Sequence, residues 1–300
     1  MCVASDVTAD TEADRLSNVN PSYRKVFLTF ARNSMVRDMT FRTNFVLQCV
    51  SSIGWTAMNV GFYLILFQHT KTIGQDSGWD EPKFFLFIAT TWFINSLVQA
   101  FFMPNAEEFS ELIRTGGLDF ALLKPIDTQF LISFRRIDWS ALSNFFAGLL
   151  IAGVSLYQLA TREIDPMVPT VLSLVLYVIF LGCGVAMMYS LMICLSATSI
   201  WLGRNQTLYN FWFYITNFSR YPMEMYNRGW GTPMYGFFTF VIPVLLVVNV
   251  PARLIAKPIS PRTNEEWMLL AWALVATVLS LVVSRWVFRR ALLSYRSASS

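Results

Sequence analysis

The residues of this sequence that could carry out chemistry are few. The only histidine is His69, and none of the four cysteines forms a CxxC pair, so neither a metal site nor a disulfide framework is indicated. No GxxxxGKS/T phosphate loop occurs, which leaves ATP without its usual binding motif. The sequence therefore predicts no catalytic residue, no metal and no cofactor on this chain.

Charged side chains are instead concentrated in one short stretch, EEFSELIRTGGLDFALLKP, at residues 107–125. Asn105 is a good N-cap, and Glu108 three residues later completes a capping-box pattern. Gly116 and the glycine after it provide a left-handed stop. The spacing predicts a separate helix over residues 106–115, about 15 Å long.

The helix predicted over residues 106–115 has two different faces, because side chains three and four positions apart lie on the same side. The apolar face carries Phe109, Leu112 and Ile113, and the charged face carries Glu107, Glu108, Glu111 and Arg114. Two interpretations remain open at this point. The helix is either a solvated amphipathic connector or a rigid lever that passes on the motion of a soluble subunit.

The composition defines the surroundings of this stretch. Of 300 residues, 55% are apolar and 14% charged, and the mean hydropathy is +0.47, whereas soluble domains are about a quarter charged. These values predict an all-α integral membrane protein. The net charge of +4 does not indicate nucleic-acid binding, because Lys and Arg fall at the ends of apolar runs and not on one face.

Six apolar runs are long enough to cross a hydrocarbon core of about 30 Å as helices. They occupy residues 44–67, 84–103, 139–159, 168–202, 234–250 and 267–287. The fourth run fits either one long helix or two spans broken at Gly182 and Gly184. A single helix leaves most Lys and Arg on the side of the N-terminus, whereas a broken one brings the two sides close to balance. The positive-inside rule therefore favours six spans with both termini in the cytoplasm.

This topology divides the chain into four parts. Residues 1–20 are polar and acidic, without the pattern of a signal peptide, and are expected to form a disordered cytoplasmic tail. Residues 21–38 are expected to form an amphipathic N-terminal interfacial helix whose apolar face, with Tyr23, Phe27 and Phe30, lies on the bilayer. Residues 39–292 form the six-span domain and residues 293–300 a cytoplasmic tail.

Uncharged polar residues enter the first two predicted spans. They are Gln48, Ser52, Thr56 and Asn59 on the first span, and Asn95 and Gln99 on the second. They either bond neighbouring helices or line a pathway or dimer seam. No acidic residue falls within a span, which argues against a carrier driven by protons or sodium. The aromatic segment with Arg220, Tyr221 and Pro222 is expected at the cytoplasmic interface.

Three segments resemble a known family. ELIRTGGLDFALLKPID at residues 111–127 is similar to the signature that follows the second span in six-span permeases of ABC type-2 transporters. SRYPMEMY at residues 219–226 resembles the aromatic Tyr-Pro segment of that family, and the C-terminal SYRSASS resembles its usual ending. The likeness covers most of the chain apart from the first twenty residues.

The resemblance implies that the charged stretch contains a coupling helix that docks into a separate ATPase subunit, which binds ATP and Mg²⁺. It carries Glu108, Glu111, Arg114 and Asp119 over as contacts, with Phe109 and Leu112 as the brace. It further implies a homodimer with two ATPase copies in a bacterial inner membrane, exporting an amphiphilic or lipid-like substrate. The alternative is a membrane assembly or scaffold protein that has a permease-like fold and transports nothing.

Overall fold

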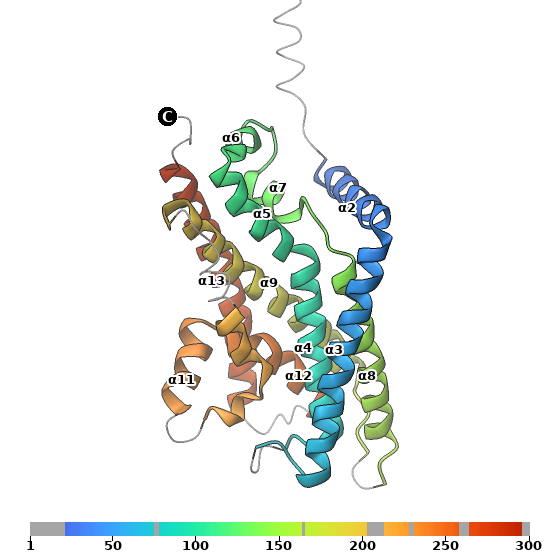
Figure 1. The fold of residues 1–300 in the computed structure, drawn as a ribbon. Coiled ribbons are helices and arrows are strands. Elements are labelled where there is room, and N and C mark those ends of the chain that lie inside the picture. Colours follow the sequence, from blue (N-terminus) through green and yellow to red (C-terminus); the bar gives the residue numbers. More distant parts are fainter. Residues whose placement is uncertain are drawn as a thin grey trace, which may run out of the picture.

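The chain folds into a bundle of long helices with shorter helices at its two ends (Figure 1). A computed structural model describes residues 22–74, 78–163, 166–202, 213–227, 231–257 and 264–295, and every regular element in them is helical. The long helices are α3 (Arg42–His69), α4 (Glu81–Phe101), α8 (Ser143–Ala160), α9 (Val171–Leu202) and α13 (Asn264–Ser294).

Five helical segments in the described part of the chain are long and apolar enough to cross a membrane. They coincide with the first, second, third, fourth and sixth predicted spans. Helix α9 is continuous over 32 residues, so the fourth run is one helix and is not broken at its glycines. A Cβ atom on Gly184 would lie 2.6 Å from the carbonyl oxygen of Val247, so this glycine permits close packing of α12 (Val244–Ala256) and does not end a helix.

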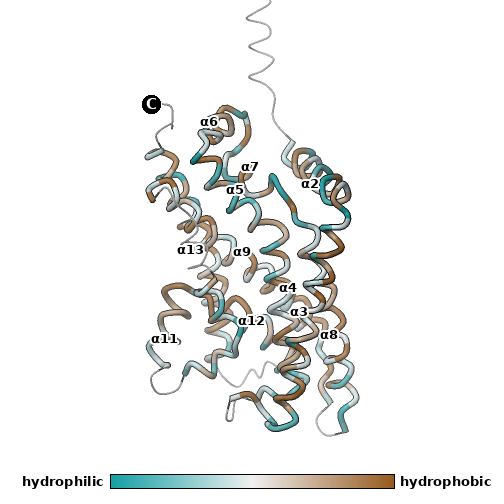
Figure 2. Tube along the Cα trace, in the orientation of Figure 1, coloured by the Kyte–Doolittle hydropathy of each residue, from teal (hydrophilic) through white to brown (hydrophobic). Residues whose placement is uncertain are grey.

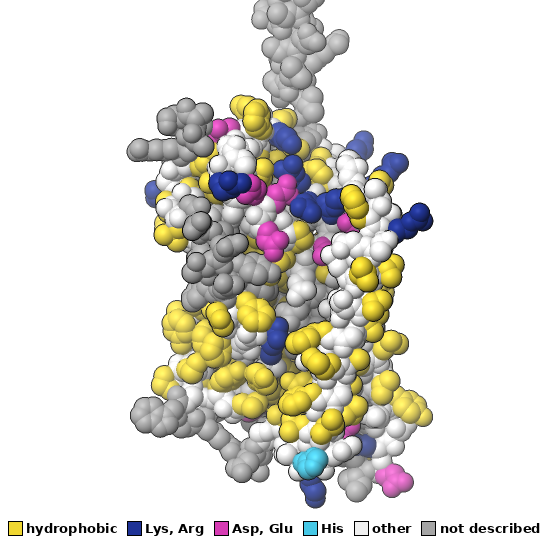
Figure 3. All heavy atoms as spheres, in the orientation of Figure 1, with side chains coloured by type: hydrophobic (Ala, Val, Ile, Leu, Met, Phe, Trp, Pro, Cys, Tyr) yellow, Lys and Arg dark blue, Asp and Glu magenta, His cyan; other side chains and the backbone are white. Residues whose placement is uncertain are grey.

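Basic side chains gather at one end of the bundle, here called the basic end (Figure 3). This end is formed by α2 (Tyr23–Thr40), α5 (Met103–Arg114), α6 (Gly117–Leu122) and α7 (Thr128–Phe134). Under the positive-inside rule it corresponds to the predicted cytoplasmic side. The hydropathy colouring agrees, with polar segments at both ends and apolar residues along α3 and α8 between them (Figure 2).

The fifth predicted span, residues 234–250, does not form a straight crossing helix. Helix α11 (Thr232–Gly236) and the π-helix η5 (Phe237–Val241) meet α12 (Val244–Ala256) at an angle of 89°. Pro243 lies at the bend, where its missing N–H and fixed φ interrupt the helix. Both α11 and α12 lie in the half of the bundle away from α6 (Figure 1). The run was predicted to cross the bilayer as one helix, whereas the structure forms two helical pieces with a sharp bend between them.

Before α11 begins, the described residues already lie at both ends of the bundle, Trp201 at one and Glu224 at the other. At the basic end, the indole Nε1 of Trp201 donates to Ser294 Oγ. At the opposite end, Glu224 pairs with Lys257, whose ammonium lies 4.5 Å from the ring centroid of Trp79, just before α4. The segment around Arg220 was expected at the cytoplasmic interface, but the structure carries it away from the basic end. Pro222 and the nearby charges gave this segment the sequence pattern of a loop, which led to the wrong expectation.

Two apolar clusters hold the bundle together. The larger one joins α4, α9 and α12 and includes Phe87, Ile94, Met188 and Val247. The smaller one lies under the basic end and joins α5, α6, α7, α9 and α13. Helix α4 is largely enclosed, whereas most of α3 is exposed in the single chain. An apolar helix exposed in this way is available to lipid or to another subunit.

Helix α2 presents a different face to the protein than the sequence predicts. The Tyr23 ring packs edge-on against Phe130 at 5.0 Å, and Phe27 packs in the same way against Phe134 at 5.7 Å. Phe30 packs on the smaller cluster. The apolar face that was expected to lie on the bilayer therefore covers α7. A second set of apolar side chains on α2 is exposed, namely Leu28, Met35, Val36 and Met39.

Candidate functional site

The hairpin of residues 103–123, which contains helices α5 and α6, projects at the basic end and is called the coupling hairpin here after the role proposed for it below. Helix α5 is not separate, because only Phe102 divides it from α4, and the Phe102 N–H still bonds the Val98 carbonyl. The capping box expected at Asn105 and Glu108 is absent for this reason, since no helix starts at Asn105. Pro104 is tolerated in the first turn of α5, where its missing N–H costs little.

Asn105 has a different role from the one predicted. It is 3% exposed, and its Nδ2 and Oδ1 pair with the carbonyl and the N–H of Arg136 at 2.7 and 2.8 Å. In the same segment between α7 and α8, the Asp138 N–H donates to the Ala100 carbonyl at 2.8 Å. These hydrogen bonds connect the segment to the junction of α4 and α5.

The apolar face of the hairpin packs on the body of the protein. Phe109 is 1% exposed and lies with its ring centroid 5.9 Å from that of Phe288 on α13. Leu112 packs against the same cluster. The brace reaches α9 and α13, so the hairpin is a continuation of the second span that is supported by the fourth and sixth.

The four predicted polar contacts separate into two groups. Glu111 and Arg114 are exposed, and Arg114 donates to both carboxylate oxygens of Glu111. This hydrogen bond holds the pKa of Glu111 below its ordinary value. Glu108 turns toward the segment after α7, with Oε1 3.4 Å from Arg135, and the carboxylate of Asp119 contributes to raising the pKa of the nearby Tyr295 hydroxyl, after the effect of burial. Only the first two of these residues face outward, so the structure does not bring the four together.

The most exposed part of the hairpin was missed by sequence reasoning. Gly116 adopts φ 72° and reverses the chain, which then forms α6. Leu118 and Ala121 face the protein, leaving Phe120, Leu122 and Leu123 outward with 73%, 41% and 81% exposure. The spacing of three between Leu118 and Ala121 was the sequence signal that could have predicted this helix and its outward face. An apolar knob, defined as these three outward residues, therefore forms the tip.

The chain beyond the tip is anchored to two long helices. Asp127 caps α7 by accepting from the Phe130 N–H at 3.0 Å, and it also forms a forked ion pair with Arg285 of α13. Gln129 accepts from Arg285 at 2.7 Å and donates to the Tyr189 hydroxyl of α9 at 3.0 Å. The hydrogen bond from Arg285 lowers the pKa of Asp127. These hydrogen bonds connect the segment after the hairpin directly to α9 and α13.

A polar cavity of about 390 Å³ lies between α3 and α4. It is lined by Ser51, Ser52, Trp55, Thr56, Asn59, Tyr63, Ile88, Thr91, Trp92, Asn95, Ser96, Gln99, Asn144 and Arg220. The polar residues predicted on the two spans are thus brought together, apart from Gln48. That residue lines an adjoining space of about 370 Å³, which shares Ser52 and Gln99 with the cavity and reaches Asp138 near the basic end.

Only part of this polar set bonds neighbouring helices. Thr56 donates to Asn144 Oδ1 at 3.1 Å, and Gln48 accepts from Ser140 at 2.8 Å. Asn59 bonds the Trp55 carbonyl within its own helix. The remaining groups, including those of Asn95 and Gln99, point into the cavity without such bonds. The interpretation as helix bonding therefore holds for the first two residues alone.

The three residues expected at the cytoplasmic interface have different surroundings in the structure. Arg220 lines the polar cavity, Tyr221 is exposed, and Pro222 is buried. Two residues later, Glu224 pairs with Arg253 at 2.8 Å and Lys257 at 2.9 Å. Burial alone raises the pKa of Glu224, but the two cations outweigh this effect and lower it.

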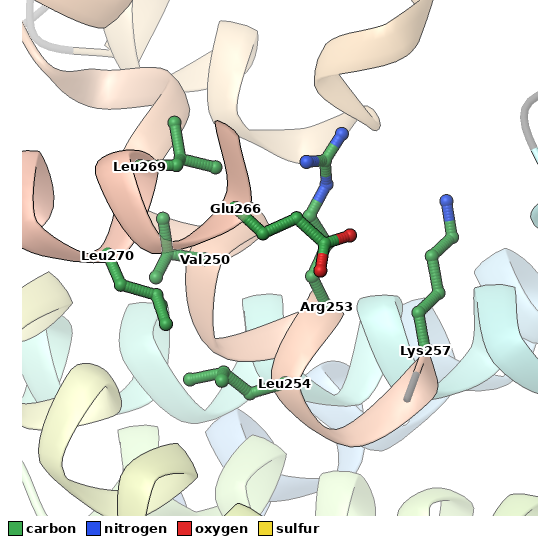
Figure 4. Close-up of a pocket in the computed structure, with 7 residues that line it drawn as sticks. All are labelled: Val250, Arg253, Leu254, Lys257, Glu266, Leu269 and Leu270. Atoms are coloured by element: carbon green, nitrogen blue, oxygen red, sulfur yellow. The ribbon is translucent and has the colours of Figure 1, made fainter. Parts of the chain in front are cut away.

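The pocket beside this ion cluster has a charged side and an aliphatic side (Figure 4). Arg253, Lys257 and Glu266 lie on one side and Val250, Leu254, Leu269 and Leu270 on the other, around about 130 Å³. The cluster ties the 223–225 turn to the end of α12, so it fixes the bent helix pair at the end opposite the hairpin.

Comparison with known protein families finds a match over most of the chain. A family model described as "ABC-2 family transporter protein" matches residues 53–299. No curated protein and no solved structure matches the chain. The matched range contains the coupling hairpin, its anchor and most of the polar cavity, whereas Gln48 and Ser52 precede it.

Proposed function

Since the chain belongs to the ABC-2 transporter family, we propose that it is the membrane-spanning permease subunit of an ATP-driven exporter. The family implies an ABC ATPase subunit as partner. ATP and Mg²⁺ then bind to that partner, and this chain is not itself the enzyme. The proposed location is a bacterial inner membrane, with the basic end in the cytoplasm.

The observation that carries this proposal is the construction of the coupling hairpin. Its tip exposes Phe120 and Leu123 at a polar end of the bundle, where water would otherwise surround them. Its root is buried through Phe109. Exposed aromatic and aliphatic side chains on a rigid support suit docking into a protein groove. The exposed Glu111 and Arg114 beside the tip suit the polar rim of such an interface.

Force applied to the tip has a defined route into the bundle. Helix α5 continues α4, so displacement of the tip tilts the enclosed helix that forms one wall of the polar cavity. The Phe109 contact and the Asp127–Arg285 pair carry the same displacement to α13. We propose that ATP-driven closure of the partner subunits moves these helices as rigid bodies and opens a path outward.

The exposed face of α3 supports assembly with a second copy. Closed two-fold symmetry is the usual arrangement of homo-oligomers, and two ATPase copies would match it. We propose a homodimer in which the polar cavities lie near the seam. The cargo is an amphiphilic or lipid-like molecule, because the cavity is polar and the surrounding helix faces are apolar.

Co-purification with the ATPase encoded in a neighbouring reading frame tests this proposal. Leu123→Asp places a charge on the knob and is expected to abolish co-purification, while Val168→Asp is the matched control. Val168 is 71% exposed but lies before α9 at the opposite end. Equal retention of the ATPase by both variants would contradict docking at the knob. Retention with no transport by the wild-type complex would favour the scaffold alternative.

A further inference from the structure

The charge on the wall of the polar cavity between α3 and α4 is positive. Among the described residues on its wall, Arg220 is the one charged side chain, and all other polar members are hydroxyls, amides or indoles. Asp138 lies in the adjoining space, where its carboxylate accepts two hydrogen bonds from Ser140. The cavity thus favours a negative group over a positive one.

Arg220 has no carboxylate partner within the described part of the chain. Its guanidinium lies over the Phe213 ring at 5.5 Å from the centroid, a contact that leaves its forked N–H donors unused. Arg220 is exposed in the single chain but lines a cavity between two membrane-spanning helices, and an arginine at membrane depth is costly unless an anion or polar groups compensate it. The guanidinium geometry matches phosphate and carboxylate oxygens in pairs.

Several neutral groups on the same wall also lack partners. Asn95, Gln99 and Ser52 make no side-chain hydrogen bond to any described residue, and the buried Ser96 Oγ has none either. Each of these groups both donates and accepts, which is the pattern that hydroxyl groups of a ligand also present. Asn95 is half-buried and Gln99 is exposed in the single chain, so their unpaired amides are open to a polar occupant at membrane depth.

Aromatic and apolar residues surround this polar set. Trp55, Trp92 and Tyr63 line the cavity, and Met58 and Phe62 on the exposed side of α3 are 58% and 61% exposed. Rings with polar edges suit the boundary between a headgroup and an acyl chain. A ligand with a polar head in the cavity can therefore lay an apolar tail along α3.

We propose that this cavity binds the headgroup of an anionic, hydroxyl-rich amphiphile. Arg220 pairs with the anionic group, and Asn95 and Gln99 bond the hydroxyls. That this ligand is the exported cargo rests on the proposed function, whereas its binding does not. A membrane lipid and a transported glycolipid share this headgroup chemistry, and transport measurements distinguish them.

Photocrosslinking of the full-length chain, purified with any ATPase that accompanies it and without ATP, tests the proposal. The probe is photoreactive phosphatidylinositol, with phosphatidylserine and phosphatidylcholine as competitors. We expect phosphatidylinositol to compete best and phosphatidylcholine least. Arg220→Gln should weaken binding of both anionic lipids about tenfold, the range of one charge-assisted hydrogen bond. Arg220→Lys should retain most of the binding, and Arg289→Gln, remote and exposed, should match the wild type.

The hydroxyl contacts are tested separately by Asn95→Leu combined with Gln99→Leu. This variant should still bind anionic lipids but lose the preference for phosphatidylinositol over phosphatidylserine. If it fails to fold, the comparison between Arg220→Gln and Arg220→Lys decides alone. Because these measurements need no ATP, absence of an ATPase partner would overturn the proposed function while leaving this result standing.

Three results would overturn the proposal. The first is equal competition by all three lipids, and the second is unchanged binding by Arg220→Gln. The third is cross-linking between two copies of Ser52→Cys in the membrane together with absence of lipid cross-linking, because a second copy would then fill the cavity.

Discussion

The carboxylate of Asp127 and the guanidinium of Arg285 form a forked ion pair that joins the start of α7 to α13, 158 positions further along the chain. Asp127 caps α7, the helix that follows the coupling hairpin in the chain. Gln129 and Tyr189 extend the ion pair to α9. Two of the long helices are thereby connected to the element proposed to receive force from the ATPase.

Breaking this pair should affect coupling more than stability. Both side chains are about a third exposed, at 37% and 32%, so solvent screening limits the loss from Asp127→Asn to about 1 kcal/mol. We expect a small decrease in melting temperature but a strong loss of ATP-driven transport. A variant that transports normally would show that the pair has no part in coupling.

The same pair predicts a pH dependence with a defined sign. Arg285 holds the pKa of Asp127 below its ordinary value of about 3.9, so its stabilisation is complete above that value. It is lost as the pH falls through the lower folded pKa. Melting curves between about pH 3 and pH 7 should therefore show a larger difference between wild type and Asp127→Asn at neutral pH than in acid. An equal difference across this range would contradict the assignment.

Two glycines on α9 provide a matched pair. A Cβ on Gly184 would meet the Val247 carbonyl oxygen at 2.6 Å, whereas a Cβ on Gly182 would meet nothing within 4 Å. Gly184→Ala should destabilise the protein by about 1–3 kcal/mol through overpacking against α12. Gly182→Ala should be neutral or stabilising by up to about 1 kcal/mol, because alanine favours helices. Thermal unfolding in detergent measures both, and equal effects would refute the α9–α12 contact.

The ion cluster at the opposite end should respond to charge removal in a similar way. Glu224→Gln leaves Arg253 and Lys257 without their shared carboxylate, at a cost of about 2 kcal/mol for charged hydrogen bonds. The pKa of Glu224 is lowered, so the cluster stabilises the protein above about pH 4.3 and loses this effect as the pH falls further. The melting temperature at neutral pH is the measurement. No change there would mean that the cluster does not hold α12.

The sequence predicted features that depend on composition and charge. Length, hydropathy and the distribution of Lys and Arg located five spans and favoured one long helix for α9. Helical periodicity placed Phe109 and Leu112 on the face that packs on the protein, and it grouped the polar residues of α3 and α4 that line one cavity. These features follow from local spacing, which the tertiary structure did not override.

Features that depend on packing between distant segments were not predicted. Hydropathy cannot distinguish a straight span from a bent pair, although Pro243 in the middle of the fifth run was a signal. The capping pattern at Asn105 was overridden because α4 continues into α5. Likewise, the apolar face of α2 has the same pattern whether it covers lipid or Phe134.

The central claim, that the coupling hairpin is where a soluble ATPase engages this chain, is tested most directly at Leu123. A single cysteine at this position, in a chain whose native cysteines are replaced by serine, would be treated with a membrane-impermeant maleimide. Labelling is predicted in inside-out vesicles only, with strong protection once the ATPase is bound. Labelling from the outer face of intact cells, or full labelling in the presence of the bound ATPase, would contradict the claim.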